Sequence, residues 1–232
     1  MDSFQEQQAW GSTSYTINPD SHTSFDTERA HIDLITNPYY GRMLFIDGVL
    51  QSTTGDEHIY HQNLILDAMG SRKQEKILIV GGAEGATLRE VQNRDAECEM
   101  GVKEITMVDW DEQLVKWMQE EEPWSQGSFD DERLSLFYQD INVYLNEHTD
   151  ECFDTVILDL LDPESEEELQ WLIDLVKRCF ERTKHLTLNA GNNPIYVAKI
   201  RQAFSHYKTV TMNIINVPSF QAPWYIVSIS SE

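Results

Sequence analysis

Carboxylates follow several apolar stretches of this sequence, at positions from which they could act together on one substrate. The stretches are typical of buried strands, and the acids that end or follow them are Glu84, Asp109, Asp140, Asp159 and Asp162. A carboxylate can hold an ammonium group and accept its proton, which an amine with a pKa of about 10.4 retains near neutral pH. A single acid is readily explained as surface decoration, but a series in equivalent positions is not. The pattern predicts a site for a positively charged small molecule.

The elements that must position these acids are short apolar runs alternating with segments of helical spacing. Unbroken apolar runs are typical of strands buried on both faces, as in a mostly parallel sheet covered by helices. Ligands of such folds bind outside the carboxyl ends of the strands. The predicted strands are 76–80, 104–109, 134–138, 155–159 and 185–189, the helices 86–92, 112–119, 167–180 and 195–204, and the closing antiparallel pair 209–215 and 224–229. We therefore expect an α/β fold with the acids gathered at one edge of the sheet.

A β pattern precedes this alternation. Its strands are predicted at 30–35, 42–48 and 49–53, the last two forming a hairpin. Over 58–69 the apolar spacing becomes helical, with Gly70 as the stop signal. We therefore predict an N-terminal β-strand domain over residues 1–55 and an α/β domain over 56–232.

Composition limits the partners and the compartment. The chain has 232 residues, with 17 Lys and Arg against 40 Asp and Glu, a formal charge of −23. Nucleic acids and anionic membrane surfaces would be repelled, although the acids are scattered and much of the charge can serve solubility alone. No apolar run is long enough to cross a membrane, and the polar N-terminal segment lacks the order of a signal peptide. Three widely spaced cysteines, Cys98, Cys152 and Cys179, favour free thiols in a cytoplasm.

The turn Val80-Gly-Gly-Ala-Glu-Gly-Ala86 joins a predicted strand to a helix. Its glycines, Gly81, Gly82 and Gly85, would let a ligand approach the backbone N–H groups at the start of the helix. The dinucleotide pattern G-x-G-x-x-G is not met, because alanines stand at two of its glycine positions. Glu84 places negative charge where a phosphate would lie, so we expect a ligand other than a phosphate there.

Two further acids suggest a nucleoside. Asp109 ends the next strand, where an acid accepts hydrogen bonds from ribose hydroxyls in nucleotide-binding α/β folds. Asp140 follows the strand after it and could accept from the exocyclic amine of adenine. A nucleoside that carries positive charge would suit an acidic crevice. S-adenosylmethionine and its decarboxylated form are sulfonium cations, and both fit.

Three blocks of the sequence resemble the polyamine aminopropyltransferases, the spermidine synthase family. The blocks are DGVLQSTTGDEHIYH (47–61), IVGGAEGATLREV (79–91) and DLLDP (159–163), with FDDERL (129–134) as a further match. Their order and spacing follow the family from about residue 29 onward. The resemblance implies a methyltransferase-like (Rossmann-like) α/β domain after a small β-domain, and a homodimer or homotetramer.

The resemblance also implies a reaction and its residues. An aminopropyl group would move from decarboxylated S-adenosylmethionine, a co-substrate rather than a tightly bound cofactor, to a di- or polyamine such as putrescine, releasing methylthioadenosine. Asp159 is the expected catalytic base. The expected donor-binding residues are Gln51, His61, Gly81, Gly82, Glu84, Gly85, Asp109, Asp140 and Ile141. The expected amine-binding residues are Tyr60, Gln62, Asp162 and Phe220.

The sequence departs from the family pattern at several positions, which leaves the acceptor amine open. Glu84 replaces an aspartate, Gln62 a glutamate and Phe220 a tyrosine, and Glu164-Ser-Glu166 replaces a Gly-Pro sequence in a lid. Two alternatives therefore stand beside the aminopropyltransferase. One is an amine N-methyltransferase that uses S-adenosylmethionine itself, and the other is a non-catalytic relative that binds a nucleoside or polyamine.

The two donors differ by one carboxylate, which an anionic Glu84 would repel unless a cation lay between them. No basic residue follows Glu84 until Arg89, and this favours the decarboxylated donor. His58 and His61 lie three residues apart, but without a clear third ligand we predict no metal site.

Overall fold

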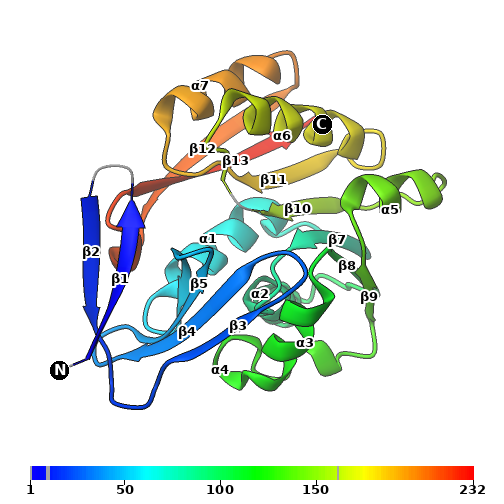
Figure 1. Cartoon of the computed structure of the whole chain (residues 1–232). Coiled ribbons are helices and arrows are strands. Elements are labelled where there is room, and N and C mark those ends of the chain that lie inside the picture. Colours follow the sequence, from blue (N-terminus) through cyan, green and yellow to red (C-terminus); the bar gives the residue numbers. More distant parts are fainter. Residues whose placement is uncertain (1, 9–10, 161) are drawn as a thin grey trace.

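A seven-stranded sheet forms the centre of the computed structural model, which describes residues 2–8, 11–160 and 162–232 (Figure 1). In spatial order its strands are β12 (Thr209–Asn216), β13 (Pro223–Ser230), β11 (His185–Asn189), β10 (Thr155–Asp159), β7 (Lys76–Gly81), β8 (Glu104–Asp109) and β9 (Leu134–Tyr138). Neighbouring strands from β11 to β9 in this order are parallel, whereas β13 is antiparallel to both β11 and β12. The predicted mostly parallel sheet is confirmed.

Helices cover both faces of this sheet because its central strands are apolar on both sides. In β7, Ile77 and Ile79 pack into one core and Leu78 and Val80 into the other. The first core holds α1 (Glu57–Met69) and α2 (Ala86–Cys98), and the second holds α5 (Ile141–Glu147), α6 (Glu166–Cys179) and α7 (Pro194–Ala203). Figure 1 shows α6 and α7 together at the top of the molecule.

Two antiparallel sheets precede α1. β1 (Ser3–Gln8) pairs with β2 (Gly11–Thr16), and a four-stranded sheet contains β3 (Thr23–Asp26), β4 (His31–Asn37), β5 (Gly41–Ile46) and β6 (Val49–Thr53). The four-stranded sheet packs on α3 (Glu112–Glu120) and α4 (Glu122–Ser125) through a core that includes Trp124. The predicted β5–β6 hairpin and the change to helix near residue 56 are confirmed. That the two parts form separate domains stays a prediction.

The strand order reverses between β7 and β10, which are neighbours in the middle of the sheet. β8 and β9 follow on one side of β7, and β11 lies on the other side of β10. Gly81 at the end of β7 is in register with Asp159 at the end of β10. Crevices at such reversals, outside the carboxyl ends of the strands, are where open α/β sheets bind ligands.

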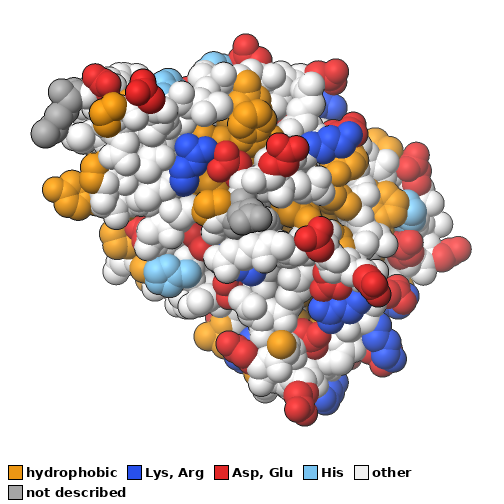
Figure 2. Space-filling view, turned by 90° about the horizontal axis from the view of Figure 1, so that it is seen from below, with side chains coloured by type: hydrophobic (Ala, Val, Ile, Leu, Met, Phe, Trp, Pro, Cys, Tyr) orange, Lys and Arg blue, Asp and Glu red, His pale blue; other side chains and the backbone are white. Residues whose placement is uncertain are grey.

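The surface reflects the charge of the sequence. In Figure 2 the Asp and Glu side chains are scattered over the face shown rather than gathered in one patch. Among the described residues, no helix is both long enough and apolar enough to cross a membrane.

Candidate active site

The glycine turn after β7 brings the backbone and the carboxylate of Asp159 together. Gly81 has a φ of +80°, and a Cβ on it would lie 2.1 Å from the main-chain oxygen of Asp159. A Cβ on Gly82 would lie 3.2 Å from Asp159 Oδ2, and one on Gly85 would lie 2.5 Å from the ring of Phe129. These contacts account for the three glycines through close packing. Their predicted contact with the donor stays a prediction.

Asp159 is held by two hydroxyl groups. The Tyr60 hydroxyl donates to Asp159 Oδ1 at 2.6 Å, and the Thr87 hydroxyl donates to Oδ2. Burial and then the neighbouring Glu84 raise the pKa of Asp159, while His61 and the two hydrogen bonds oppose the rise. A carboxylate in this environment is a stronger base than an exposed one, which suits proton transfer from an amine.

His61 lies between two glutamates in the same crevice. Its Nδ1 is 2.7 Å from Glu57 Oε2, and its Nε2 is 3.1 Å from Glu84 Oε1. Burial alone would lower the pKa of His61, but the hydrogen bonds to Glu57 and Glu84 outweigh it and raise the pKa to about 10. The ring is therefore an imidazolium at neutral pH, with both nitrogens donating.

The His61 imidazolium weakens the repulsion that Glu84 would exert on a donor carboxylate. The sequence suggested that no cation lay near Glu84, and that expectation is wrong, because His61 reaches Glu84 from another element. Arg89 does not reach Glu84. Its guanidinium bonds to Glu57 at 2.9 and 3.0 Å, to Glu90, and to the main-chain oxygen of Trp124.

The same cluster bears on metal binding. Ligand atoms of His61, Glu84 and Asp159 lie within 4.8 Å of one another. An imidazolium has no free lone pair for a metal, so His61 would have to lose its proton and a glutamate bond first. His58, the other histidine considered from the sequence, is exposed.

Two further acids lie close enough to this cluster to act on its charges or be acted on by them. Asp109 ends β8, and Asp109 Oδ1 accepts a hydrogen bond from the Asp111 main-chain N–H at 2.9 Å. Burial, with smaller contributions from Asp111, Glu84 and Asp159, raises the pKa of Asp109 to about 6. Asp162 packs against Gly191, where an added Cβ would lie 2.5 Å from the Asp162 Cβ.

Asp162 also titrates away from its ordinary range. Burial first, then Glu164 and Glu168, raise its pKa to about 6. Its neighbour Leu161, within the DLLDP block, lies outside the described residues. The crevice thus contains several carboxylates that hold their protons more tightly than free acids, so a bound cation would stabilise their ionised forms.

Aromatic rings lie in a row from Tyr60, the hydrogen-bond partner of Asp159, through Phe220 to Trp224. The Phe220 ring lies 6.2 Å from that of Tyr60 and 4.6 Å from that of Trp224, and Trp224 Nε1 donates to Asn189 Oδ1 at 2.8 Å. The short helix η2 (Pro218–Phe220) is tied to the start of α1, because Asp56 accepts from the backbone N–H and the hydroxyl of Ser219. Phe220 therefore adjoins Tyr60, and the assignment of both residues to the amine site stays a prediction.

Among the described residues, no contact brings the other predicted site residues into this cluster. Gln51 donates to Val49 O in its own strand, and Gln62 is exposed on α1. Asp140 caps α5 by accepting from the Asn142 N–H, and Ile141 is buried in the core beneath α6. Their roles in binding stay predictions.

Two residues of the site were missed from the sequence. Thr87 lies in the first turn of the helix after the glycine turn, a position at which a hydroxyl can point back into the crevice. Glu57 lies four residues before His61, a spacing that places two side chains on one helix face. Both features are present in the sequence, but their roles became clear only when the structure showed Thr87 bonded to Asp159 and Glu57 bonded to His61.

A family model described as spermine/spermidine synthase domain matches residues 57–232. The polyamine aminopropyltransferase of Sulfurisphaera tokodaii is 35% identical over 207 residues, 83% of this chain and 65% of that protein. Polyamine aminopropyltransferase 1 of Hyperthermus butylicus is 34% identical, and the match includes 78% of this chain and 65% of that protein. The polyamine aminopropyltransferase of Saccharolobus islandicus is 32% identical, over 87% of this chain and 69% of that protein. The chain thus covers 65% of the first two relatives, slightly less than two thirds of their length, and 69% of the third.

Solved structures show the same fold. A spermidine synthase crystallised with the transition-state analogue AdoDATO superposes with a TM-score of 0.83 at 22% identity, over 99% of this chain and 80% of that one. The spermidine synthase of Thermotoga maritima superposes with a TM-score of 0.80 at 21% identity, over 99% and 79%.

Proposed function

Because the chain belongs to the spermine/spermidine synthase family, we propose that it transfers an aminopropyl group from decarboxylated S-adenosylmethionine to a di- or polyamine such as putrescine. Membership of this family is what the three sequence blocks predicted, and that prediction is confirmed. The observation that carries the proposed activity is the half-buried Asp159 carboxylate, held by Tyr60 and Thr87 beside Glu84 at the strand-order reversal.

The proposed reaction needs a base but no acid. A primary amine attacks the carbon next to the sulfonium, the C–S bond breaks, and neutral methylthioadenosine leaves with the electron pair. The attacking nitrogen must lose a proton, and Asp159 accepts it. The raised pKa of Asp159 brings its basicity closer to that of the amine, and alignment of the two substrates supplies further acceleration.

Binding is divided between the two sides of Asp159. Glu84 and Asp109 would hold the aminopropyl ammonium and the ribose of the donor, with Gln51, His61, Gly81, Gly82, Gly85, Asp140 and Ile141 along the nucleoside. Tyr60, Gln62, Asp162 and Phe220 would line the amine side. The co-crystallised AdoDATO of the spermidine synthase neighbour supports a donor of this kind.

A second function, N-methylation with S-adenosylmethionine, is favoured by one observation. The His61 imidazolium partly neutralises Glu84, so Glu84 alone does not exclude the donor's carboxylate. Product analysis with each donor against a panel of amines decides between the two. We expect methylthioadenosine and an aminopropylated amine. Methylated amine with S-adenosylhomocysteine would support the methyltransferase, and nucleoside binding without turnover would support a non-catalytic relative.

Thr87→Val should make the reaction more sensitive to acid. The hydrogen bond from the Thr87 hydroxyl lowers the pKa of the Asp159 carboxyl. Loss of this hydrogen bond therefore raises the pKa, so that Asp159 becomes protonated at a higher pH. Because Asp159 acts without its proton, the acid limb of the kcat/KM profile moves to higher pH. A hydrogen bond to a charged group is worth about 1.5–3 kcal/mol, so the rate on that limb should fall roughly tenfold or more.

Thr87→Ser is the matched control for this prediction, because it retains the hydroxyl, and its profile should stay near that of the wild type. An acid limb that is the same in Thr87→Val and Thr87→Ser would contradict the positioning role of Thr87.

We also propose a cytoplasmic homodimer or homotetramer. The three cysteines, Cys98, Cys152 and Cys179, form no disulfide among themselves, which supports a reducing compartment. Sedimentation analysis of the purified protein measures the oligomeric state directly.

A further inference from the structure

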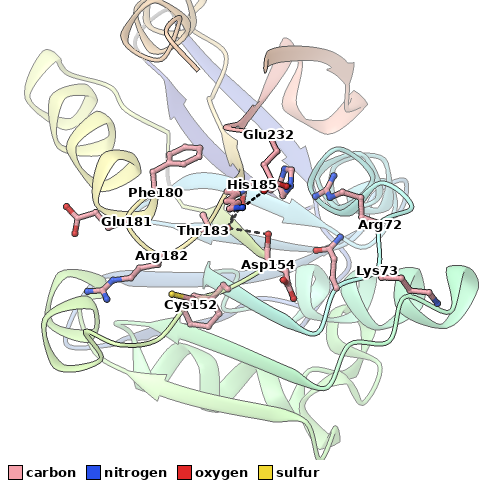
Figure 3. Close-up of a pocket in the computed structure, with 13 residues that line it drawn as sticks. Arg72, Lys73, Cys152, Asp154, Phe180, Glu181, Arg182, Thr183, His185 and Glu232 are labelled. Carbon is pink, nitrogen blue, oxygen red and sulfur yellow. Dashed lines mark hydrogen bonds and ion pairs between the residues drawn. The ribbon is translucent and has the colours of Figure 1, made fainter. Parts of the chain in front are cut away.

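A cavity of about 590 Å³ lies at the amino ends of the parallel strands, away from the acidic crevice at their carboxyl ends (Figure 3). Asp154 lines it just before β10, and His185 lines it as the first residue of β11. The proposed reaction uses none of its lining residues.

This cavity concentrates positive charge in a strongly acidic chain. Acids outnumber Lys and Arg by 40 to 17 overall, but the charged residues that line the cavity are Arg72, Lys73, Arg182 and Lys184 with Asp154, Glu181 and Glu232. Most Lys and Arg side chains pair with a carboxylate, as Arg42, Lys103 and Arg133 do. Across the described ranges, Arg72, Lys73 and Arg182 have no carboxylate oxygen within 4.0 Å.

The carboxylate of Glu232, whose side chain is 54% exposed, lies beside two other residues that line the cavity. Lys184 Nζ donates to Glu232 Oε1, and His185 Nε2 lies 3.8 Å from Glu232 Oε2. Figure 3 shows Arg72 extending toward the same carboxylate, whereas Arg182 and Glu181 point away from it. Glu232 thus pairs with Lys184 and lies beside His185, whereas Arg72 has no carboxylate oxygen within 4.0 Å among the described residues.

The other central acid is already engaged. Asp154 Oδ2 accepts from the main-chain N–H groups of Glu75 and Lys76 at 2.6 and 2.9 Å. Its carboxylate therefore serves the start of β7 rather than Arg72, whose Nη2 donates to the main-chain oxygen of Ala68 at 2.9 Å and to the Thr155 hydroxyl at 3.4 Å.

A smaller hollow of about 140 Å³ adjoins the cavity and shares Arg72 and His185 with it. Hydroxyl groups, among them Thr187, Thr211 and Ser228, line this hollow together with the carboxyl group of Asp67. Guanidinium, ammonium and hydroxyl donors together are the groups that bind phosphate oxygens in proteins. A phosphate, with two charges and several acceptor oxygens, uses this set more fully than a single carboxylate does.

We propose that this cavity binds a phosphate-bearing small molecule through Arg72, Lys184 and His185, with Glu232 as the internal anion that the phosphate displaces. The proposal does not depend on the reaction performed at Asp159. It applies to the opposite edge of the sheet, so it is compatible with the exclusion of phosphate from the glycine turn by Glu84.

Calorimetric titration with inorganic phosphate at constant ionic strength tests this site. We expect saturable binding that weakens at least tenfold in Arg72→Gln and tightens several-fold in Glu232→Gln, because the second change removes the competing carboxylate. Arg201→Gln on α7 and Glu28→Gln before β4 alter the same charges on exposed residues elsewhere, and both should bind phosphate like the wild type. Asp159→Asn should also bind it normally.

Three results would overturn the assignment. The first is no saturable binding of phosphate by the wild type. The second is an equal loss in Arg72→Gln and Arg201→Gln, which would indicate a general charge effect. The third is acetate binding as tightly as phosphate, which would leave nothing specific to a phosphate group.

Discussion

Asp159→Asn should abolish turnover while leaving the donor bound. The amide keeps the size of the carboxylate but cannot accept the proton of the attacking amine, and general-base catalysis typically contributes 10²–10⁴-fold. We therefore expect kcat to fall by about 10³-fold, with the Kd of the nucleoside changed by less than roughly threefold. Steady-state rates and calorimetric binding of methylthioadenosine measure the two quantities.

The stability of this variant separates chemistry from folding. An acid whose pKa is raised in the folded state destabilises the fold when ionised, and the cost disappears as the pH falls through that pKa. Burial and Glu84 raise the pKa of Asp159, so the neutral amide should leave the Tm at pH 7 equal or higher. Asp154→Asn, at the other end of β10, is the matched control and should keep full turnover. Near-normal turnover in Asp159→Asn would refute the assignment of the base.

Arg89→Gln should cause the largest loss of stability of any change considered for this protein. The Arg89 side chain is 8% exposed and bonds to Glu57 and Glu90, whose side chains are also buried. Its removal leaves Glu57 buried with only His61 to compensate, and breaking a buried ion pair on one side typically costs about 3–5 kcal/mol. For a chain of this length, that corresponds to a fall in Tm of roughly 10 °C. Thermal and urea unfolding measure it.

Two further variants test whether the broken ion pair causes the loss of stability in Arg89→Gln. Arg201→Gln removes an exposed guanidinium from α7 and should change the free energy of unfolding by less than about 0.5 kcal/mol. The double variant with Glu57→Gln should be less destabilised than the sum of the single variants, because the uncompensated carboxylate is then absent. Additive effects would show that Arg89 acts through packing rather than through its ion pair.

The strands and most helices were predictable because they depend on local patterns. β7 and β10 contain continuous apolar runs, and α1 ends at Met69, directly before Gly70, which has the positive φ expected of a helix stop. α5 was not predicted, since it has only seven residues and no strong apolar period. The hairpin of β1 and β2 was covered only by the general β character of the N-terminal region.

The site was predictable in part for a related reason. Acids at strand ends are visible in the sequence, and parallel strands must bring their carboxyl ends to one edge. Gln51 and Gln62 show the limit of this reasoning. Their assignment to the site came from the resemblance, and no contact among the described residues links them to Asp159. The bridge from His61 to Glu84 joins residues of different elements, which no local pattern specifies.

The sequence by itself determined the family, the order of the strands along the chain and the acids that end them. Only the tertiary structure decided which of those acids share a crevice and which protons they hold. A pKa depends on burial and on charges a few ångströms away, and both are set by residues distant in the chain. For that reason His61 became an imidazolium between two glutamates, Arg89 turned toward Glu57, and Asp159 gained basicity, none of which is visible in the order of the residues.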